Sequence, residues 1–182
     1  MIKYISILRG INLGGHNKIL MSDLKLLYES LYFTQVVTYI QSGNVIFEAK
    51  DNEDPSELAQ KIEHAIAEKY SFTVPVIIRT VEEWAKIVSN NPFLREEGID
   101  LEKLHVTFLS DLPSDVPLDK IKTFDYPPDK FVIMDKNVYL YCPIDYGHTK
   151  LSNSFFESKL KVKATTRNWK TLNKLLELST QI

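Results

Sequence analysis

The chain has little cysteine and almost no net charge, and each shortage excludes a class of protein. Its single cysteine, Cys142, cannot form an internal disulfide, which is typical of a reducing cytosol. The formal net charge is -2 and the pI is near 6.1. Non-specific binding to nucleic acid or to an anionic membrane needs a positive surface, so this charge disfavours both partners.

Long hydrophobic runs are also lacking. Near the start, Lys3 and Arg9 bracket an apolar run over residues 4–8 that is too short for a signal peptide. No later run reaches membrane-spanning length. We therefore expect a cytoplasmic protein without a membrane partner.

With 182 residues, of which 44% are hydrophobic, the chain can bury one core or two smaller ones. The first part alternates residue patterns typical of strands and helices. Asp54 and Pro55 form a strong helix start, Ser22 is a candidate N-cap, and Pro75 suits an edge strand. The expected order is βαββαβ, with strands over 3–8, 35–41, 45–48 and 74–78, and helices over 22–31 and from residue 55.

The second part predicts the same order again. Thr80 and Glu83 have the spacing of a capping box that opens a helix to about residue 89. Trp169 and Leu172 lie on the apolar stripe of a terminal helix. Between these two helices we expect strands over 105–109, 131–134, 138–142 and 162–165, and helices over 118–122 and 151–160.

This repeated order has a known structural solution, the ferredoxin-like split βαβ unit of the α+β class. We predict two such subdomains in tandem, residues 1–79 and 80–182, with a helix between them and a helix at the C-terminus. In this fold the end of the first strand lies at the same sheet edge as the hairpin of the next two strands. Residues 9–18 and 41–44 should therefore be neighbours, and so should 145–150 and 165–169.

The loop over residues 9–18 is the most distinctive stretch, because it holds three of the six glycines. Glycine tolerates positive φ, so this loop should have a defined shape. Its spacing resembles a phosphate-binding P-loop, but His16 and Asn17 stand where that motif needs a lysine and a hydroxyl residue. The glycines do not fit a dinucleotide-binding fingerprint either. A nucleotide-hydrolysing loop is therefore disfavoured.

Two readings of this loop stay open. Backbone N–H groups of a glycine-rich turn can bind an anion, and nearby cationic side chains would reinforce that binding. In the alternative reading, Asn12 and Asn17 satisfy local backbone groups of a structural turn. The first reading predicts one ligand-binding site, formed by Arg9, Gly10, Asn12, Gly14, Gly15, His16, Lys18, Gln41, Ser42 and Asn44.

A second candidate ligand-binding cluster lies in the most basic part of the chain. Residues 150–177 hold seven Lys or Arg and only two acidic residues. Arg and Lys beside an aromatic ring suit phosphate binding and base stacking, although Trp169 could instead anchor the last helix to the core. The cluster comprises His148, Lys150, Arg167, Asn168 and Trp169.

RNA binding is supported by one further pattern. If His105, Thr107, Tyr139 and Tyr141 share one sheet face, that face could stack bases as an RNA-recognition domain does. The strands do not match the aromatic consensus of such domains, and the acidic pI disfavours the interpretation. The same face could instead be buried against the other subdomain.

Other chemistries have weak signals. The four histidines and Cys142 lack metal-ligand spacing, and we predict no metal site. Ser42 lacks the nucleophile-elbow context, Cys142 is expected in the core, and no carboxylate pair stands out as an acid and a base. Catalysis, cofactor and oligomeric state stay unassigned.

Four segments resemble the bacterial domain-of-unknown-function family number 1697: LRGINLGGHNK, YIQSGNVIFE, KLSNSFFESKL and TTRNWKTLNKLLEL. The resemblance implies two ferredoxin-like subdomains in a cytosolic bacterial protein and supplies no catalytic role. The family often has arginine where this chain has His148. Our leading expectation is a binder of a small anionic or phosphorylated ligand at the glycine-rich loop. The alternatives are an RNA- or nucleotide-binding module and an interaction or assembly protein.

Overall fold

The computed structural model describes residues 1–50 and 53–181. They divide into two compact units, one formed by residues 1–50, 53–86 and 174–181 and the other by residues 87–173. The boundaries between the units fall within two helices, α3 (Val81–Ser89) and α6 (Trp169–Ser179).

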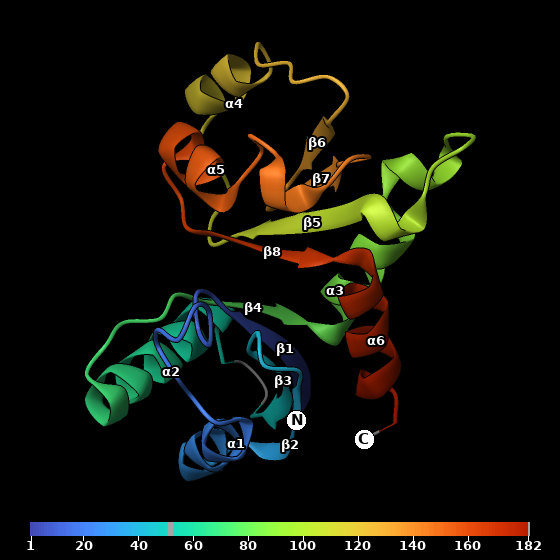
Figure 1. Cartoon of the computed structure of the whole chain (residues 1–182). Helices are drawn as coiled ribbons and strands as arrows, with labels where there is room; N and C mark the ends of the chain where they lie inside the picture. Colours follow the sequence, from blue (N-terminus) through green and yellow to red (C-terminus); the bar gives the residue numbers. More distant parts are fainter. Residues whose placement is uncertain (51–52, 182) are drawn as a thin grey trace. The chain divides into compact units, whose positions relative to one another are not determined.

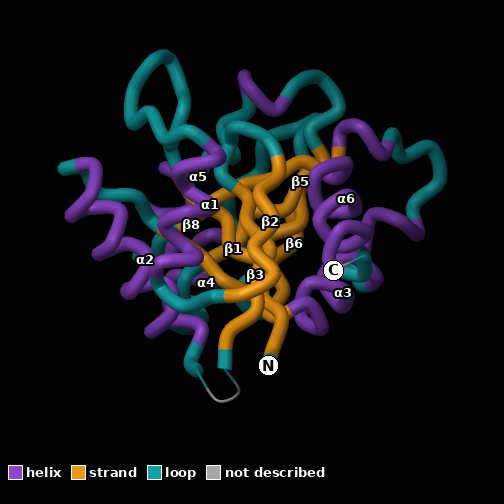
Figure 2. Tube along the Cα trace, turned by 90° about the horizontal axis from the view of Figure 1, so that it is seen from below, coloured by secondary structure: helices purple, strands orange, loops and turns teal. Residues whose placement is uncertain are grey.

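The first unit is a four-stranded antiparallel sheet with two helices. Its strands are β1 (Ile2–Leu8), β2 (Thr34–Tyr39), β3 (Asn44–Ala49) and β4 (Val76–Thr80), and its helices are α1 (Met21–Ser30) and α2 (Pro55–Tyr70). The strand order is β2-β3-β1-β4, and Figure 2 shows β2, β3 and β1 side by side. β4 is an edge strand, and Pro75 immediately precedes it. This is the ferredoxin-like order that the sequence predicts.

Both helices of this unit pack on one face of the sheet (Figure 1). They bury a core in which the rings of Tyr4, Tyr28, Phe33 and Phe47 contact one another at centroid distances of 4.6–5.9 Å. The Tyr28 hydroxyl is 2.8 Å from the buried Ser6 Oγ, and burial raises the pKa of this tyrosine. The sheet and both helices of this unit therefore share one packed core.

The second unit repeats the arrangement. Its strands are β5 (Leu104–Leu109), β6 (Lys130–Met134), β7 (Asn137–Tyr141) and β8 (Ala164–Asn168), in the order β6-β7-β5-β8. Its helices are α4 (Asp115–Ile121) and α5 (Asn153–Leu160), with short 3₁₀ turns η1 (Pro92–Arg95), η2 (Leu101–Lys103) and η3 (Tyr146–His148). The predicted α+β class and the tandem ferredoxin-like order are confirmed.

Local capping signals locate two helix starts correctly. Asp54 accepts a hydrogen bond of 2.7 Å from the Ser56 N–H at the start of α2. Thr80 and Glu83 form the predicted capping box: the Glu83 N–H donates to Thr80 Oγ1 at 3.1 Å, and the Thr80 N–H donates to Glu83 Oε2 at 2.8 Å. Both signals depend on contacts between residues only two or three apart in the sequence, so they form here as the sequence predicts.

Two expectations about element ends are wrong. Ser22 does not cap α1: the N-cap residue is Leu20, which provides no side-chain cap. The last strand of the second unit runs from Ala164 to Asn168, later than the predicted 162–165, because it pairs in register with β5 up to His105 opposite Asn168. In both places contacts with the rest of the fold decide the boundary.

The predicted aromatic face of the second sheet is also wrong. In the observed register His105 lies opposite Leu140, whereas Val106 lies opposite Tyr139. The histidine and the tyrosine therefore point to opposite faces of the sheet. Tyr139 is only 2% exposed, and its hydroxyl donates to the Ile87 carbonyl at 3.0 Å.

Candidate functional site

The glycine-rich loop connects β1 to α1 and is held by backbone bonds to two neighbouring segments. The Leu8 N–H donates to the Gly43 carbonyl at 2.8 Å, and the Arg9 N–H donates to the Pro75 carbonyl at 3.0 Å. The loop therefore lies beside the β2–β3 hairpin, as predicted from the sheet topology.

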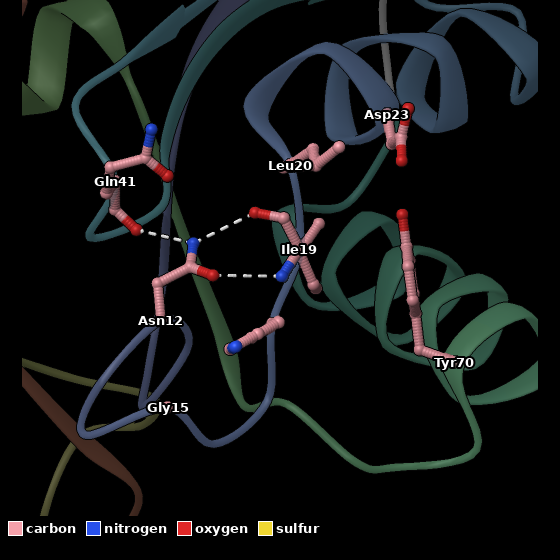
Figure 3. A pocket seen from close by; sticks show the side chains of 8 residues that line it. Asn12, Gly15, Ile19, Leu20, Asp23, Gln41 and Tyr70 are labelled. Atoms are coloured by element: carbon pink, nitrogen blue, oxygen red, sulfur yellow. Dashed lines mark hydrogen bonds between the residues drawn. The ribbon is translucent and has the colours of Figure 1, made fainter.

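Asn12 connects the loop to Ile19, just before α1, and to the β2–β3 hairpin through three hydrogen bonds (Figure 3). Its Nδ2 donates to the carbonyls of Ile19 and Gln41, each at 2.9 Å, and its Oδ1 accepts from the Ile19 N–H at 2.9 Å. The residue has a φ of 56°, a left-handed conformation that asparagine tolerates better than most residues. Asn17 donates through Nδ2 to the Gly10 carbonyl at 3.1 Å. Both asparagines therefore satisfy backbone groups of the loop and its surroundings, as the structural-turn reading predicts.

Gly43 determines how closely the hairpin approaches the loop. Its φ is +79°, and a Cβ placed on it would lie 2.7 Å from Ile11 Cδ1 and 2.9 Å from Leu8 Cβ. Both distances are too short for carbon atoms. Only glycine fits here without displacing the apolar residues beneath the loop.

Ser42 and Asn44 belong to the same hairpin, and their side chains hold its turn. Asn44 is fully buried and donates through Nδ2 to the Tyr39 carbonyl at 2.9 Å and to Ser42 Oγ at 3.1 Å. These contacts give both residues a role in positioning the hairpin.

A pocket of about 410 Å³ lies between the glycine-rich loop and the first turn of α1 (Figure 3). This volume is within the usual range for small-molecule sites, which is roughly 300–1,000 Å³. Four of its lining residues are among the predicted ligand-binding residues, and four are not. The lining comprises Asn12, Gly15, Lys18, Ile19, Leu20, Asp23, Gln41 and Tyr70.

Tyr70 supplies an unusual polar group at the pocket wall. Its ring stacks on Phe72 with centroids 5.8 Å apart, and Lys69 Nζ lies 5.4 Å from the ring centroid. These contacts fix the ring, and Figure 3 shows its hydroxyl pointing toward the Asp23 carboxylate. The hydroxyl oxygen is shielded from solvent and has no hydrogen-bond partner among the described residues.

The charged groups on the lining have opposite signs. Lys18 comes from the glycine-rich loop, and Asp23 comes from the first turn of α1. In the described part of the chain, neither side chain forms an ion pair. Arg9 and His16, predicted as cationic members of the site, do not line this pocket.

Sequence reasoning missed Ile19, Leu20, Asp23 and Tyr70 as pocket residues. Asp23 had a visible signal. It is an acidic residue in the first turn of a helix, and that turn is close to any ligand bound by the preceding loop. Tyr70 had none, since it is the last residue of α2 and reaches the pocket only through the packing of α2 beside α1.

The second predicted cluster lies in the other unit, and its side chains make separate contacts. Lys150 Nζ lies 5.3 Å from the ring centroid of Tyr126. Asn168 caps α6 by accepting from the Thr171 N–H at 2.8 Å, and Trp169, the first residue of α6, is only 7% exposed. The contacts of Asn168 and Trp169 are those of residues that position a helix.

Burial disfavours the charged forms of two basic side chains of this unit, Arg167 and His105. Burial lowers the pKa of Arg167 to about 10, although Tyr146 partly opposes the effect. Burial also lowers the pKa of His105, whose ring stacks on Tyr146 at a centroid distance of 4.5 Å. The contact between His105 and Tyr146, together with the pairing of His105 with Asn168, confirms that the loop over 145–150 and the end of β8 share one edge.

His148 and Cys142 differ sharply in exposure. His148 is exposed, and its Nδ1 lies 2.7 Å from Asp145 Oδ2. Cys142 is fully buried, and burial raises the pKa of its thiol to about 11, which confirms that it is a core residue.

Across residues 1–50 and 53–181, no cluster of three or more His, Cys, Asp or Glu could hold a metal ion. No helix in the described ranges is long and apolar enough to cross a membrane.

Comparisons with known proteins agree with the fold. No curated protein matches the sequence. Among solved structures, the conserved bacterial protein SP0830 from Streptococcus pneumoniae is similar, with a TM-score of 0.73, 23% sequence identity and 99% of each chain covered. At this identity the similarity shows the fold alone. Residues 1–139 match the family described as "Protein of unknown function (DUF1697)", and the chain therefore belongs to that family.

Proposed function

We propose that this protein binds a small organic anion in the pocket beside the glycine-rich loop, with Lys18 contacting the anionic group. The observation that carries the proposal is the pocket itself: about 410 Å³, walled by Ile19 and Leu20 and bordered by one lysine. Apolar walls with a few polar groups are typical of small-molecule sites.

The surrounding contacts support a preformed site. The three hydrogen bonds of Asn12 and the close approach of Gly43 hold the loop and the hairpin in place. A preformed wall lowers the entropy cost of binding, because few groups need to be ordered by the ligand. Lys18 is exposed, and its flexible ammonium can reach an anion within the pocket.

The nucleic-acid alternative has less support. Its predicted stacking face is split between the two sides of the sheet, and the Tyr139 ring is buried. The Tyr141 ring packs near Phe93, with centroids 6.2 Å apart. A base would therefore have to displace protein contacts before it could stack.

A thermal-shift panel tests the proposal. Wild-type protein, Lys18→Gln and the control Lys25→Gln are each heated with hexanoate, hexyl phosphate, adenosine monophosphate or a short single-stranded RNA, at two salt concentrations. Lys25 is a suitable control because it lies on α1 outside the pocket lining. A ligand at a hundred times its dissociation constant stabilises the fold by about 2.7 kcal/mol, which is readily measured.

We expect a small organic anion to raise the melting temperature of the wild type and of Lys25→Gln, and to lose this effect in Lys18→Gln. A shift that survives in Lys18→Gln contradicts the proposal. A shift seen only with RNA, and lost steeply with salt, contradicts it in favour of phosphate-backbone binding.

A further inference from the structure

We infer that the natural ligand of this pocket is an extended zwitterion, with an anionic group at Lys18 and a primary ammonium group between Asp23 and Tyr70. The inference rests on the proposed function and adds the second charged group. It follows from the unlike charges of the lining and from the unpartnered Tyr70 hydroxyl.

The lining does not suit a polyanion. Asp23 would repel an anion at its end of the pocket, and the additional predicted cations, Arg9 and His16, are not on the lining. A ligand with one anionic and one cationic group matches this pair of charges.

The two charges belong to different sides of the pocket. Figure 3 shows Asn12 and Gly15 of the glycine-rich loop on one side and Asp23 with Tyr70 on the other, with Ile19 and Leu20 between them. Lys18 belongs to the loop, so a ligand that meets both charges extends from the loop across the apolar wall to α1. A molecule with an amine and a carboxylate at the two ends of a short hydrocarbon chain can make both contacts.

The unpartnered Tyr70 hydroxyl supports a ligand at this end of the pocket more strongly than Asp23 does. An acidic residue in a first helical turn stabilises the helix dipole, which by itself accounts for Asp23. A buried hydroxyl without a partner destabilises the fold, and helix stability does not account for its presence. The hydroxyl points toward the Asp23 carboxylate, and no hydrogen bond joins the two.

An ammonium group fits between these two oxygens better than other groups do. It has three donors and no acceptor, so it can donate to the carboxylate and to the phenolic oxygen at the same time. The negative charge of Asp23 favours a cation over a neutral hydroxyl, because charge-assisted hydrogen bonds are the stronger ones. The Tyr70 oxygen is shielded in the absence of a ligand, so side chains around it must shift slightly for an ammonium group to reach it.

Isothermal titration calorimetry with matched probes tests the inference. The probes are hexanoate, 6-hydroxyhexanoate and 6-aminohexanoate, which differ only in the group at the far end of the chain. We expect 6-aminohexanoate to bind about tenfold tighter than the other two, the effect of one hydrogen bond to a charged group. Asp23→Asn should abolish this preference and leave hexanoate binding intact. Glu29→Gln, on the same helix and outside the lining, should keep the preference.

Tyr70→Phe should weaken 6-aminohexanoate binding and leave hexanoate binding unchanged. Equal affinity for hexanoate and 6-aminohexanoate in the wild type overturns the inference and leaves the proposed function standing. Equal affinity for the hydroxyl and amino probes, or a preference retained in Asp23→Asn, also overturns it. If none of the three probes binds, the proposed function fails together with the inference.

Discussion

Gly43→Ala should be one of the most damaging single-methyl changes in the first unit. At φ +79° an L-residue is strained, at a cost of about 1–2 kcal/mol. The new Cβ would also lie 2.7 Å from Ile11 Cδ1 and 2.9 Å from Leu8 Cβ, and overpacking of this kind costs about 1–3 kcal/mol. We therefore expect the free energy of unfolding to fall by about 2–5 kcal/mol, a large part of the roughly 5–15 kcal/mol typical of a folded protein.

Gly10→Ala separates the two contributions. Gly10 has a φ of +72°, and nothing lies within 4 Å of a Cβ placed there. Only the backbone strain applies, so we expect a loss of about 1–2 kcal/mol. Urea unfolding followed by circular dichroism measures both variants. If Gly43→Ala loses no more stability than Gly10→Ala, the hairpin does not press on the loop, and our account of the pocket wall is wrong.

Three further changes test other parts of the structure. Asn12→Ala should lower the free energy of unfolding by about 2–4 kcal/mol in the same assay, because three hydrogen bonds to backbone groups are lost; a smaller loss than in Gly10→Ala would contradict the contacts. Tyr70→Phe should leave stability unchanged or raise it by up to about 1 kcal/mol, since the buried hydroxyl has no partner to lose; a clear loss would show that the hydroxyl is bonded in solution. His105 should titrate below its usual 6.5 in proton NMR spectra, because burial lowers its pKa. As the pH falls through 6.5, the unfolded state therefore takes up a proton before the folded state does, and the free energy of unfolding should fall. His105→Gln should flatten this pH dependence. An NMR titration midpoint of His105 above 6.5 would contradict the prediction.

The parts of the fold that follow from local sequence were predictable. The proline and acidic cap at the start of α2 and the capping box of Thr80 and Glu83 both act within a few residues, and both are found as expected. The neighbourhood of the glycine-rich loop and the β2–β3 hairpin was also predictable, because it follows from the element order of the ferredoxin-like unit.

Features set by tertiary contacts were not predictable. The backbone of Ile19 is fixed by Asn12, and α1 begins two residues later at Met21, so Leu20 becomes the cap in place of Ser22. The register of β5 against β7 is not visible in residue alternation, and His105 and Tyr139 consequently lie on opposite faces.

The candidate site shows the same division. Asn12, Gly15, Lys18 and Gln41 line the pocket and were predictable, because they belong to two segments that the topology brings together. Tyr70 was not predictable, because it is the last residue of α2 and follows the loop by more than fifty residues in the sequence.

The proposed function is the binding of a small organic anion in the pocket beside the glycine-rich loop. Its most direct test is a titration of ¹⁵N-labelled protein with hexanoate, followed in ¹H–¹⁵N correlation spectra. We predict saturable shifts of the backbone amides of Gly15, Lys18, Ile19 and Leu20, with the amides of the second unit unmoved and the shifts lost in Lys18→Gln. Unchanged spectra at saturating concentrations, or shifts confined to other parts of the chain, would contradict the claim.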